Sequence, residues 1–354
     1  MIDLSTFLKE MISLPGLSGY ESPVREPIAR TWQPLVDELS VSKLGSLHGL
    51  RRANVKGDHH SVLIATHMDA IGLMVAGLDD GLLRVMSIGG LDLRILVGQM
   101  VTVHGKRELP GILQMIPDRL QDKSKAGSPP GITDLFIDTG LPINEVSDLV
   151  KLGDLVSFAT PPQEMSGGAL AGHSLDNRAS VAALTLCLEE IRKFNLAWDV
   201  WAVATTQEEE TLVGARTSAY EIKPDIAVVV DVTFAKGPGV TDYHTFAAGK
   251  GPTIGVGSNM HPALGKYFKT LADEMDLPYA MEYMPKSSGT DAMAIQVSEE
   301  GIPCAVLGIP LRYMHTPLEM VVLKDIQRTG RLLARFITQL ETDTMEKIFG
   351  ERKA

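Results

Sequence analysis

The chain has 354 residues, of which 44% are hydrophobic and 22% are charged, and its formal net charge is -11. This length exceeds what one hydrophobic core usually fills, so we expect two domains or one domain with a large insertion. The acidic balance disfavours nucleic acid and anionic membrane surfaces as partners, because both require a basic face, and no apolar run approaches the ~20 residues of a membrane-spanning helix.

The N-terminal segment predicts two helices followed by strands. Residues 2–14 have the pattern of an amphipathic helix that ends at Pro15-Gly16, and a second helix begins near Ser22-Pro23, where a serine cap precedes a proline. A strand pair follows at about residues 35–41 and 49–54. The apolar run SVLIAT then predicts a strand that is buried on both faces of a sheet.

The pattern of apolar and polar residues changes between residues 72 and 158. Short alternating or apolar runs are separated by turns, and Asp80-Gly81 lies between two such runs, which is a strong hairpin signal. One helix is expected, at residues 147–152. The polar segment at residues 118–130 is rich in turn formers and is expected to be mobile. We therefore predict a small β-barrel-like domain at residues 72–158, inserted into a catalytic domain formed by residues 1–71 and 159–354.

Helices and strands alternate after the insertion. The elements expected there are a helix from Asp176, a strand ending in VWAVATT, a helix at residues 213–220, the strand IAVVV, a helix at 262–275, a short helical run after Asp291, the strand CAVLGI and a C-terminal helix at 323–340. This alternation predicts an α/β fold with a mostly parallel, helix-covered sheet. Cys187 and Cys304 are expected to be free, buried thiols, as in a protein of the reducing cytoplasm, and the N-terminus lacks a signal-peptide core.

Imidazoles and carboxylates follow several of the predicted strands. His67 comes directly after SVLIAT, Glu209 lies just beyond VWAVATT, Asp231 ends IAVVV and His315 follows CAVLGI. Ligands of open α/β sheets gather beyond the carboxyl ends of the strands. The pattern therefore indicates a site that binds divalent metal through nitrogen and oxygen, without sulfur.

Each candidate ligand also has an ordinary structural interpretation. Asp69, two residues after His67 on the same face, either orients that imidazole or is a polar strand terminus. Asp176 is either a helix N-cap or a carboxylate shared by two metals. Asp231 fits a turn as well as a ligand, and His315 fits an ordinary loop.

Three consecutive glutamates need a separate account. One interpretation of Glu208, Glu209 and Glu210 is that the dipole of a helix N-terminus stabilises their negative charge. The other is catalytic: one glutamate binds metal, and its neighbour takes a proton from a metal-bound water. Packed behind a buried strand, they would repel one another unless a cation or a proton lies among them.

Six motifs match a known family in the family's own order, and the resemblance covers essentially the whole chain, including the insertion. The motifs are ATHMDAIG (65–72), GHSLDNR (172–178), TTQEEETLVGA (205–215), VVVDVT (228–233), SSGTDA (287–292) and PLRYMHTPLE (310–319). The chain resembles the tetrahedral-type dinuclear aminopeptidases of metallopeptidase family 42, some of which were once labelled cellulases. The resemblance implies a zinc-exopeptidase-like fold, peptide substrates, and two divalent ions per subunit, zinc or cobalt.

The resemblance also implies individual roles. One metal is held by His67, Asp176 and Asp231, and the second by Asp176, Glu209 and His315, with Asp176 shared by both. Glu208 is the general base and Asp69 orients His67. The inserted domain is expected to form dimers, which assemble into a dodecamer.

The sequence departs from the family pattern at two places. Ala70 stands where the family usually has glutamate, and Glu210-Thr211 stands where it usually has Val-Gly. An acid beside the metals is expected to influence specificity. The alternatives are another metal-dependent amidohydrolase (a deacylase or carboxypeptidase), a glycoside hydrolase that uses paired carboxylates, or an assembly scaffold without turnover.

Overall fold

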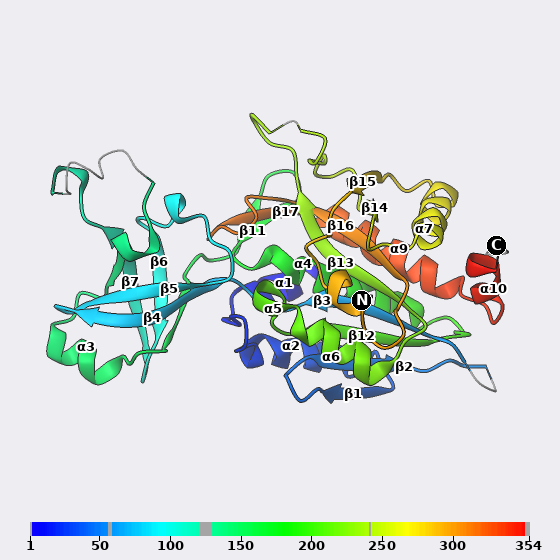
Figure 1. Ribbon diagram of the computed structural model, residues 1–354, viewed down its shortest axis with the longest axis horizontal. Coiled ribbons are helices and arrows are strands. Elements are labelled where there is room, and N and C mark those ends of the chain that lie inside the picture. Colours follow the sequence, from blue (N-terminus) through cyan, green and yellow to red (C-terminus); the bar gives the residue numbers. More distant parts are fainter. Residues whose placement is uncertain (1, 56–58, 121–128, 241, 351–354) are drawn as a thin grey trace.

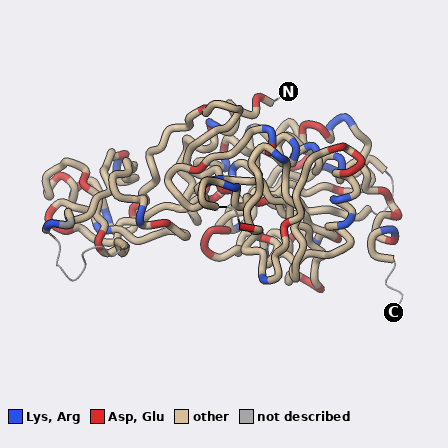
Figure 2. The backbone as a smooth tube through the Cα atoms, turned by 90° about the horizontal axis from the view of Figure 1, so that it is seen from above, with Lys and Arg blue, Asp and Glu red and all other residues tan. Residues whose placement is uncertain are grey.

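The protein has two lobes, a helix-covered sheet and a closed barrel that projects from one end of it (Figure 1). The computed structural model describes residues 2–55, 59–120, 129–240 and 242–350. Figure 2 shows Lys and Arg interspersed with Asp and Glu along both lobes, so the acidic excess is not confined to one of them.

Four parallel strands form the centre of the sheet. They are, in spatial order, β12 (Asp199–Thr205), β3 (Ser61–His67), β13 (Ile226–Phe234) and β16 (Cys304–Arg312). Alternate residues of β3 enter opposite cores: Val62 and Ile64 pack under one layer of helices, and Leu63 and Ala65 under the other. Burial on both faces is why these strands are continuous apolar runs, as the sequence predicts.

The sheet as a whole is mixed, which corrects the expectation of a mostly parallel sheet. Only its centre and the β14–β15 pair are parallel, because the other flanking pairings are antiparallel. Short connections allow this for β1–β2, β10–β11 and β16–β17, whereas the other antiparallel pairs join segments distant in the sequence. The flanking strands are β1 (Glu38–Val41), β2 (Leu47–Arg51), β10 (Gln163–Met165), β11 (Ala169–Gly172), β14 (Thr253–Gly257), β15 (Ala280–Met284) and β17 (Glu319–Val322). The last five were not predicted from the sequence, and β10, β11 and β17 are only three or four residues long.

Helices cover both faces of the sheet. The larger core lies under α1 (Leu4–Ile12), α2 (Ser22–Trp32), α4 (Leu175–Ile191), α7 (Pro262–Glu274) and α9 (Leu323–Thr338). The smaller core lies under α6 (Val213–Ile222) and α8 (Ala292–Ile295). The four-residue helix α5 (Glu208–Thr211) follows β12, and α10 (Thr344–Phe349), which the sequence did not predict, ends the described chain. Ser22 is the first residue of α2 rather than its cap, which is Glu21.

All strands of the barrel lie between residues 72 and 158. Their spatial order is β4-β5-β8-β7-β6-β9, from β4 (Gly72–Asp79), β5 (Leu82–Ile88), β8 (Leu135–Asp138), β7 (Glu108–Met115), β6 (Met100–His104) and β9 (Leu155–Phe158). Short 3-10 turns occur at η1 (Leu93–Ile95), η2 (Asp118–Leu120) and η4 (Ile132–Asp134). The barrel has its own apolar core, separate from the two cores of the sheet.

The hairpin predicted in this region is confirmed, whereas the predicted helix starts at a different residue. Asp80 and Gly81 both have positive φ and join β4 to β5 as the predicted hairpin. The barrel helix α3 spans Ile143–Leu149, four residues earlier than predicted, because Pro142 fixes its start. Of the segment predicted to be mobile, residues 121–128 lie outside the described residues.

Two further expectations concern the whole chain. Cys187 and Cys304 are buried and free, and burial raises the pKa of both thiols, Cys304 to about 12. Among the described residues, no helix is long and apolar enough to cross a membrane.

Candidate metal centre

A split between two central strands creates the space for the site. The pairing of β3 with β13 ends at Ala65 and Val229, although both strands continue beyond these residues. The Asn177 side chain occupies part of the gap and donates to the carbonyl oxygen of Val230 at 2.9 Å. The chain thereby satisfies one of the backbone groups that the separated strands leave without a ladder partner.

His67 lies at the end of β3 and faces this gap. Its Nε2 is 3.2 Å from Asp176 Oδ1 and 3.7 Å from Asp231 Oδ1, and its side chain is buried. Its Nδ1 is 3.4 Å from Asp69 Oδ1. Asp69 also accepts hydrogen bonds from the backbone N–H groups of Glu208 and Glu209, so it connects the end of β3 to the start of α5.

Asp231 lies within β13, three residues before its end, rather than in a turn. The strand continues because Val232 and Thr233 pair with β16 beyond the end of the apolar run. An extended backbone at this position points the carboxylate of Asp231 toward His67, and the turn interpretation is wrong.

Asp176 is placed between the two histidines. Its Oδ1 lies 3.2 Å from His67 Nε2 and its Oδ2 lies 3.5 Å from His315 Nε2. The residue falls within α4 but has non-helical backbone angles, and the peptide bond to Asn177 is cis. No side chain makes a capping hydrogen bond at the start of this helix, which argues against the cap interpretation of Asp176.

The three consecutive glutamates point to different neighbours. Glu208 Oε2 lies 3.8 Å from His67 Nε2, and Glu209 Oε2 lies 3.6 Å from His315 Nε2. Glu210 accepts a hydrogen bond from the backbone N–H of Gly89, at the exit of the barrel strand β5, at 2.6 Å. The departure from the family pattern at Glu210 therefore makes a contact between the lobes instead of adding a carboxylate to the centre.

His315 lies in the loop between β16 and β17 and has a φ of +61°. Glu319, at the start of β17, is buried and accepts the backbone N–H groups of both His315 (3.2 Å) and Asp176 (3.0 Å). This single carboxylate ties together the two segments that deliver these candidate ligands.

Negative charge is crowded at the centre. Burial raises the pKa of four carboxyl groups above their ordinary values, and neighbouring carboxylates raise it further: Glu208, Glu209, Asp231 and Glu319. The nearby His67 partly opposes this increase at Glu208, Glu209 and Asp231. Burial alone would lower the pKa of His67, but the surrounding carboxylates raise it well above its usual value. The cluster therefore favours the uptake of positive charge, either protons or a cation.

The donor atoms fit divalent metal. Zinc bonds to imidazole nitrogen and carboxylate oxygen measure about 2.0–2.2 Å, so two ligands of one tetrahedral ion lie about 3.3–3.6 Å apart. The histidine–carboxylate distances of 3.2–3.8 Å cover this range and exceed most hydrogen bonds. Glu209 Oε1 is buried and has no hydrogen-bond partner among the described residues.

Two overlapping triads place one donor atom from each member within 4.8 Å of the others. They are His67, Glu208 and Asp231, and His67, Asp176 and Glu209. Glu208 is thus positioned to bind an ion as well as to accept a proton, and the geometry by itself allows either role.

Sequence reasoning assigned no role to three charged residues of this region. Glu319 holds two ligand segments, Asp291 accepts the hydroxyl of Thr205 at 2.6 Å, and Arg178 donates to the carbonyl oxygens of Met11, Leu14 and Met68. All three are buried. Each lies in one of the motifs that support the family resemblance, so charge within those motifs was the available signal.

The family described as M42 glutamyl aminopeptidase matches residues 49–332. The lysyl aminopeptidase of Pyrococcus furiosus is 32% identical, over 94% of this chain and 96% of the relative. The crystal structure of a TET aminopeptidase from a marine sediment archaeon of the Thaumarchaeota superposes with a TM-score of 0.92 at 28% identity, covering 98% of each chain. A TET peptidase of Pyrococcus horikoshii, described as assembling into a tetrahedron or a large octahedral shell, has a TM-score of 0.83 at 28% identity and covers 96% of this chain and 100% of its own.

Proposed function

The chain belongs to the M42 glutamyl aminopeptidase family and is a peptidase, and we propose that it removes residues from the N-termini of short peptides with two divalent ions bound at the described centre. The observation that supports two ions is the position of Asp176. Its two oxygens face two different histidines, His67 and His315, at 3.2 and 3.5 Å. A carboxylate shared in this way suits metals about 3.5–4 Å apart.

The proposed ligand sets follow the two sides of Asp176. His67 and Asp231 complete one set with Asp176, while Glu209 and His315 complete the other. Imidazole and carboxylate donors without sulfur fit zinc or cobalt. When bound, such ions supply a Lewis acid for the peptide carbonyl and lower the pKa of water at the site.

Glu208 is assigned the proton transfer. Its carboxylate lies beside His67 at the edge of the ligand cluster and its side chain is only 9% exposed, so a proton that it accepts is held away from bulk water. It would pass that proton to the leaving amine. Asp69 positions the pair, because it contacts His67 Nδ1 and accepts the N–H of Glu208.

An α-amino group is the substrate feature that this acidic centre is suited to bind. Buried carboxylates surround the proposed metals, and a free peptide N-terminus can bind a carboxylate as an ammonium cation or a metal as a neutral amine. The same centre gives no comparable reason to select a C-terminal carboxylate, which favours aminopeptidase over carboxypeptidase action.

The test is release of the first residue from a short peptide, with and without a chelator. A free N-terminal peptide should be hydrolysed, its N-acetylated form should not, and the chelator should abolish the reaction reversibly. Cleavage of the acetylated peptide at its acyl group would instead identify a deacylase. Release of the last residue would identify a carboxypeptidase, and no turnover with metal bound would favour a scaffold.

We also propose that residues 72–158 form a separate dimerisation domain and that dimers assemble into a dodecamer. Met100 and Ile112 support a contact surface, because they are paired across β6 and β7 and both are exposed on the outside of the barrel, by 48% and 41%. Related TET structures are described as a dodecamer and as polyhedral shells.

Sedimentation tests the assembly. Met100→Lys with Ile112→Lys should yield smaller species than the unmodified protein, whereas Glu145→Lys, on the exposed side of α3, should not. A monomeric unmodified protein with full activity at micromolar concentration would contradict the proposal. We also propose a cytoplasmic location, because the two free cysteines fit a reducing compartment. Cell fractionation would test it.

A further inference from the structure

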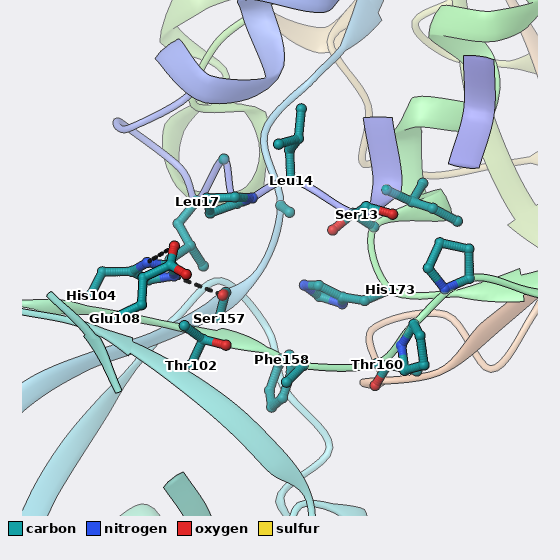
Figure 3. A pocket seen from close by; sticks show the side chains of 18 residues that line it. Ser13, Leu14, Leu17, Thr102, His104, Glu108, Ser157, Phe158, Thr160 and His173 are labelled. Carbon is teal, nitrogen blue, oxygen red and sulfur yellow. Dashed lines mark hydrogen bonds and ion pairs between the residues drawn. The ribbon is translucent and has the colours of Figure 1, made fainter. Parts of the chain in front are cut away.

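A cavity of about 320 Å³ lies at the junction of the barrel and the sheet lobe (Figure 3). Its lining residues do not include any of the candidate metal ligands or Glu208. The volume is at the lower end of the range of ligand pockets, which is roughly 300–1,000 Å³. The cavity is therefore large enough for a small molecule and separate from the proposed active site.

The barrel contributes a polar wall. His104 Nε2 lies 2.8 Å from Ser157 Oγ, and His104 Nδ1 lies 3.6 Å from Glu108 Oε1. The register of β6, β7 and β9 places these residues together with Thr102, since His104 pairs with Glu108 and Thr102 pairs with Ser157. The Glu108 side chain is 73% exposed, so this end of the cavity opens to solvent.

The opposite wall carries polar atoms without partners. His173 is only 6% exposed and its imidazole points into the cavity, toward the His104–Glu108 pair (Figure 3). Its Nδ1 and the hydroxyl oxygen of Ser174 are buried and have no hydrogen-bond partner among the described residues. A buried polar atom without a partner costs about 1–3 kcal/mol, so a ligand that satisfies these atoms would be favoured.

The deep end requires an uncharged hydrogen-bond donor. Burial and the nearby Arg178 lower the pKa of His173 to about 3, while hydrogen bonds to the backbone of Ile71 and Thr316 oppose the shift. The imidazole is thus neutral at physiological pH. Because hydrogen bonds that raise a histidine pKa are donated by the ring, Nδ1, which has no partner among the described residues, is left as an acceptor.

The open end favours a cation. The described lining residues include one carboxylate, Glu108, and neither Lys nor Arg. Between the two ends the surface is largely apolar, with Leu14, Leu17 and Phe158 on it. The complementary molecule has an ammonium group, an apolar body and an uncharged N–H or O–H group.

We propose that this cavity binds a small aliphatic amine that carries an uncharged hydrogen-bond donor at its far end, of the amino-alcohol or amino-amide class. The ammonium lies at Glu108 and the donor group at His173 Nδ1 and Ser174. The floor of the cavity, residues 13–17, is held in place by the hydrogen bonds from Arg178 to the carbonyl oxygens of Leu14 and Gly16. The backbone of this floor is therefore in place before a ligand arrives, whereas the side chains of His173 and Ser174 have to shift for Nδ1 and Oγ, which are buried here, to reach it.

Calorimetric titration with 5-amino-1-pentanol tests the proposal, using 1-pentylamine and 1,5-pentanediol as matched probes that lack the donor and the charge, respectively. We expect saturable binding of the amino alcohol. The diol should bind about fivefold more weakly, as for a solvent-exposed ion pair, and the amine about tenfold more weakly, as for one hydrogen bond. Absence of saturable binding at millimolar concentration, or equal binding of the three probes, would overturn the proposal.

Two cavity variants test which residues contact each end of the ligand. In Glu108→Gln the amino alcohol and the diol should bind equally. In His173→Phe with Ser174→Ala, which removes both acceptors, the amino alcohol and the amine should bind equally. Glu145→Gln, an exposed acid of the barrel outside the cavity, should leave all three affinities unchanged. Unchanged preferences in both cavity variants would contradict the assignment.

Metal removal separates this site from the active site, because an amine can also bind a metal ion. The titration is repeated after treatment with a chelator, and binding at the cavity should persist with the same affinity. Binding that disappears with the metal would place the amine at the active site and overturn the cavity proposal, without bearing on peptidase activity.

Discussion

The barrel core and the metal centre differ in the kind of side chain they bury and in their backbone conformations. The barrel core consists of buried apolar side chains such as Val103, Leu113 and Ile137, and among the described non-glycine residues of residues 72–158 only Asp80, in the hairpin turn, has a positive φ. The metal centre crowds buried carboxylates around His67, and several residues beside it have positive φ, namely Ser174, Gln207, Leu212, Tyr313 and His315.

This difference indicates where each region obtains its stability. The barrel is stabilised by apolar burial that its own sequence supplies. The centre contains conformations and charges that raise its local free energy, by about 1–3 kcal/mol for each unfavourable backbone conformation, so the surrounding sheet and bound cations must stabilise it. Changes at the centre should therefore alter metal binding and catalysis, while changes in the barrel core should alter stability alone.

The largest expected effect is that of Asp176→Asn, which removes the charge shared by the two ligand sets. We expect both ions and all hydrolysis to be lost, together with the stabilisation by metal, about 2.7 kcal/mol per ion at a concentration of 100 times Kd. Elemental analysis and thermal unfolding measure both effects. His67→Ala and His315→Ala serve as controls that should each reduce mainly one position, and full occupancy in Asp176→Asn would exclude a shared ligand.

Glu208→Gln should separate catalysis from metal binding. We expect kcat to fall about 10²–10⁴-fold, the usual contribution of a general base, while metal content stays near normal. Steady-state kinetics with elemental analysis checks this prediction. Loss of an ion in the variant would show that Glu208 is a ligand, as its triad with His67 and Asp231 allows.

Leu113→Ala tests the barrel side of the comparison. The Leu113 side chain is fully buried, so its truncation should leave a void in the barrel core and reduce the free energy of unfolding by about 2–5 kcal/mol. Ile137→Val in the same core should reduce it by about 0.5–1.5 kcal/mol. Denaturant titration measures the loss. Neither change should alter metal content, and a parallel loss of metal would mean that the two regions are not energetically separate.

The smallest effect is expected at the contact between the regions. Glu210→Ala removes the acceptor for the Gly89 N–H, which joins α5 to the exit of β5. The loss of one hydrogen bond, about 1 kcal/mol, should lower kcat/KM by up to about fivefold without loss of metal. Glu210→Gln keeps an acceptor oxygen and should retain wild-type activity. Equal losses in the two variants would instead implicate the charge of Glu210.

Much of the fold could be predicted because its signals are local. SVLIAT and CAVLGI are short apolar runs with Val and Ile, the pattern of a strand that is covered on both faces, and Asp80-Gly81 has the residues that a hairpin turn requires. The short strands β10, β11 and β17 could not be predicted in this way. With three or four residues each, they have little pattern of their own, and β11 and β17 form because they pair with each other across about 150 residues of sequence.

The candidate site was predicted in its residue types but not in its construction. Buried strands ending in His67 or followed by Glu209 indicated a sheet edge with metal ligands. The sequence did not indicate that Asp231 lies inside β13, that β3 and β13 separate, or that Glu319 holds the backbones of Asp176 and His315. Each of these depends on a partner distant in the sequence, as Gly308 is for Asp231 and Glu319 is for Asp176, or on the end of a strand pairing.

The sequence by itself determined which segments are buried, where the barrel strands turn and which side chains can bind metal, because hydrophobic patterning and donor chemistry are properties of short stretches of chain. The tertiary structure decided which carboxylate faces which histidine, that Glu210 contacts the barrel rather than the centre, and that a cavity separates Glu108 from His173. These are distances between remote segments, and only the packing of the two lobes fixes them.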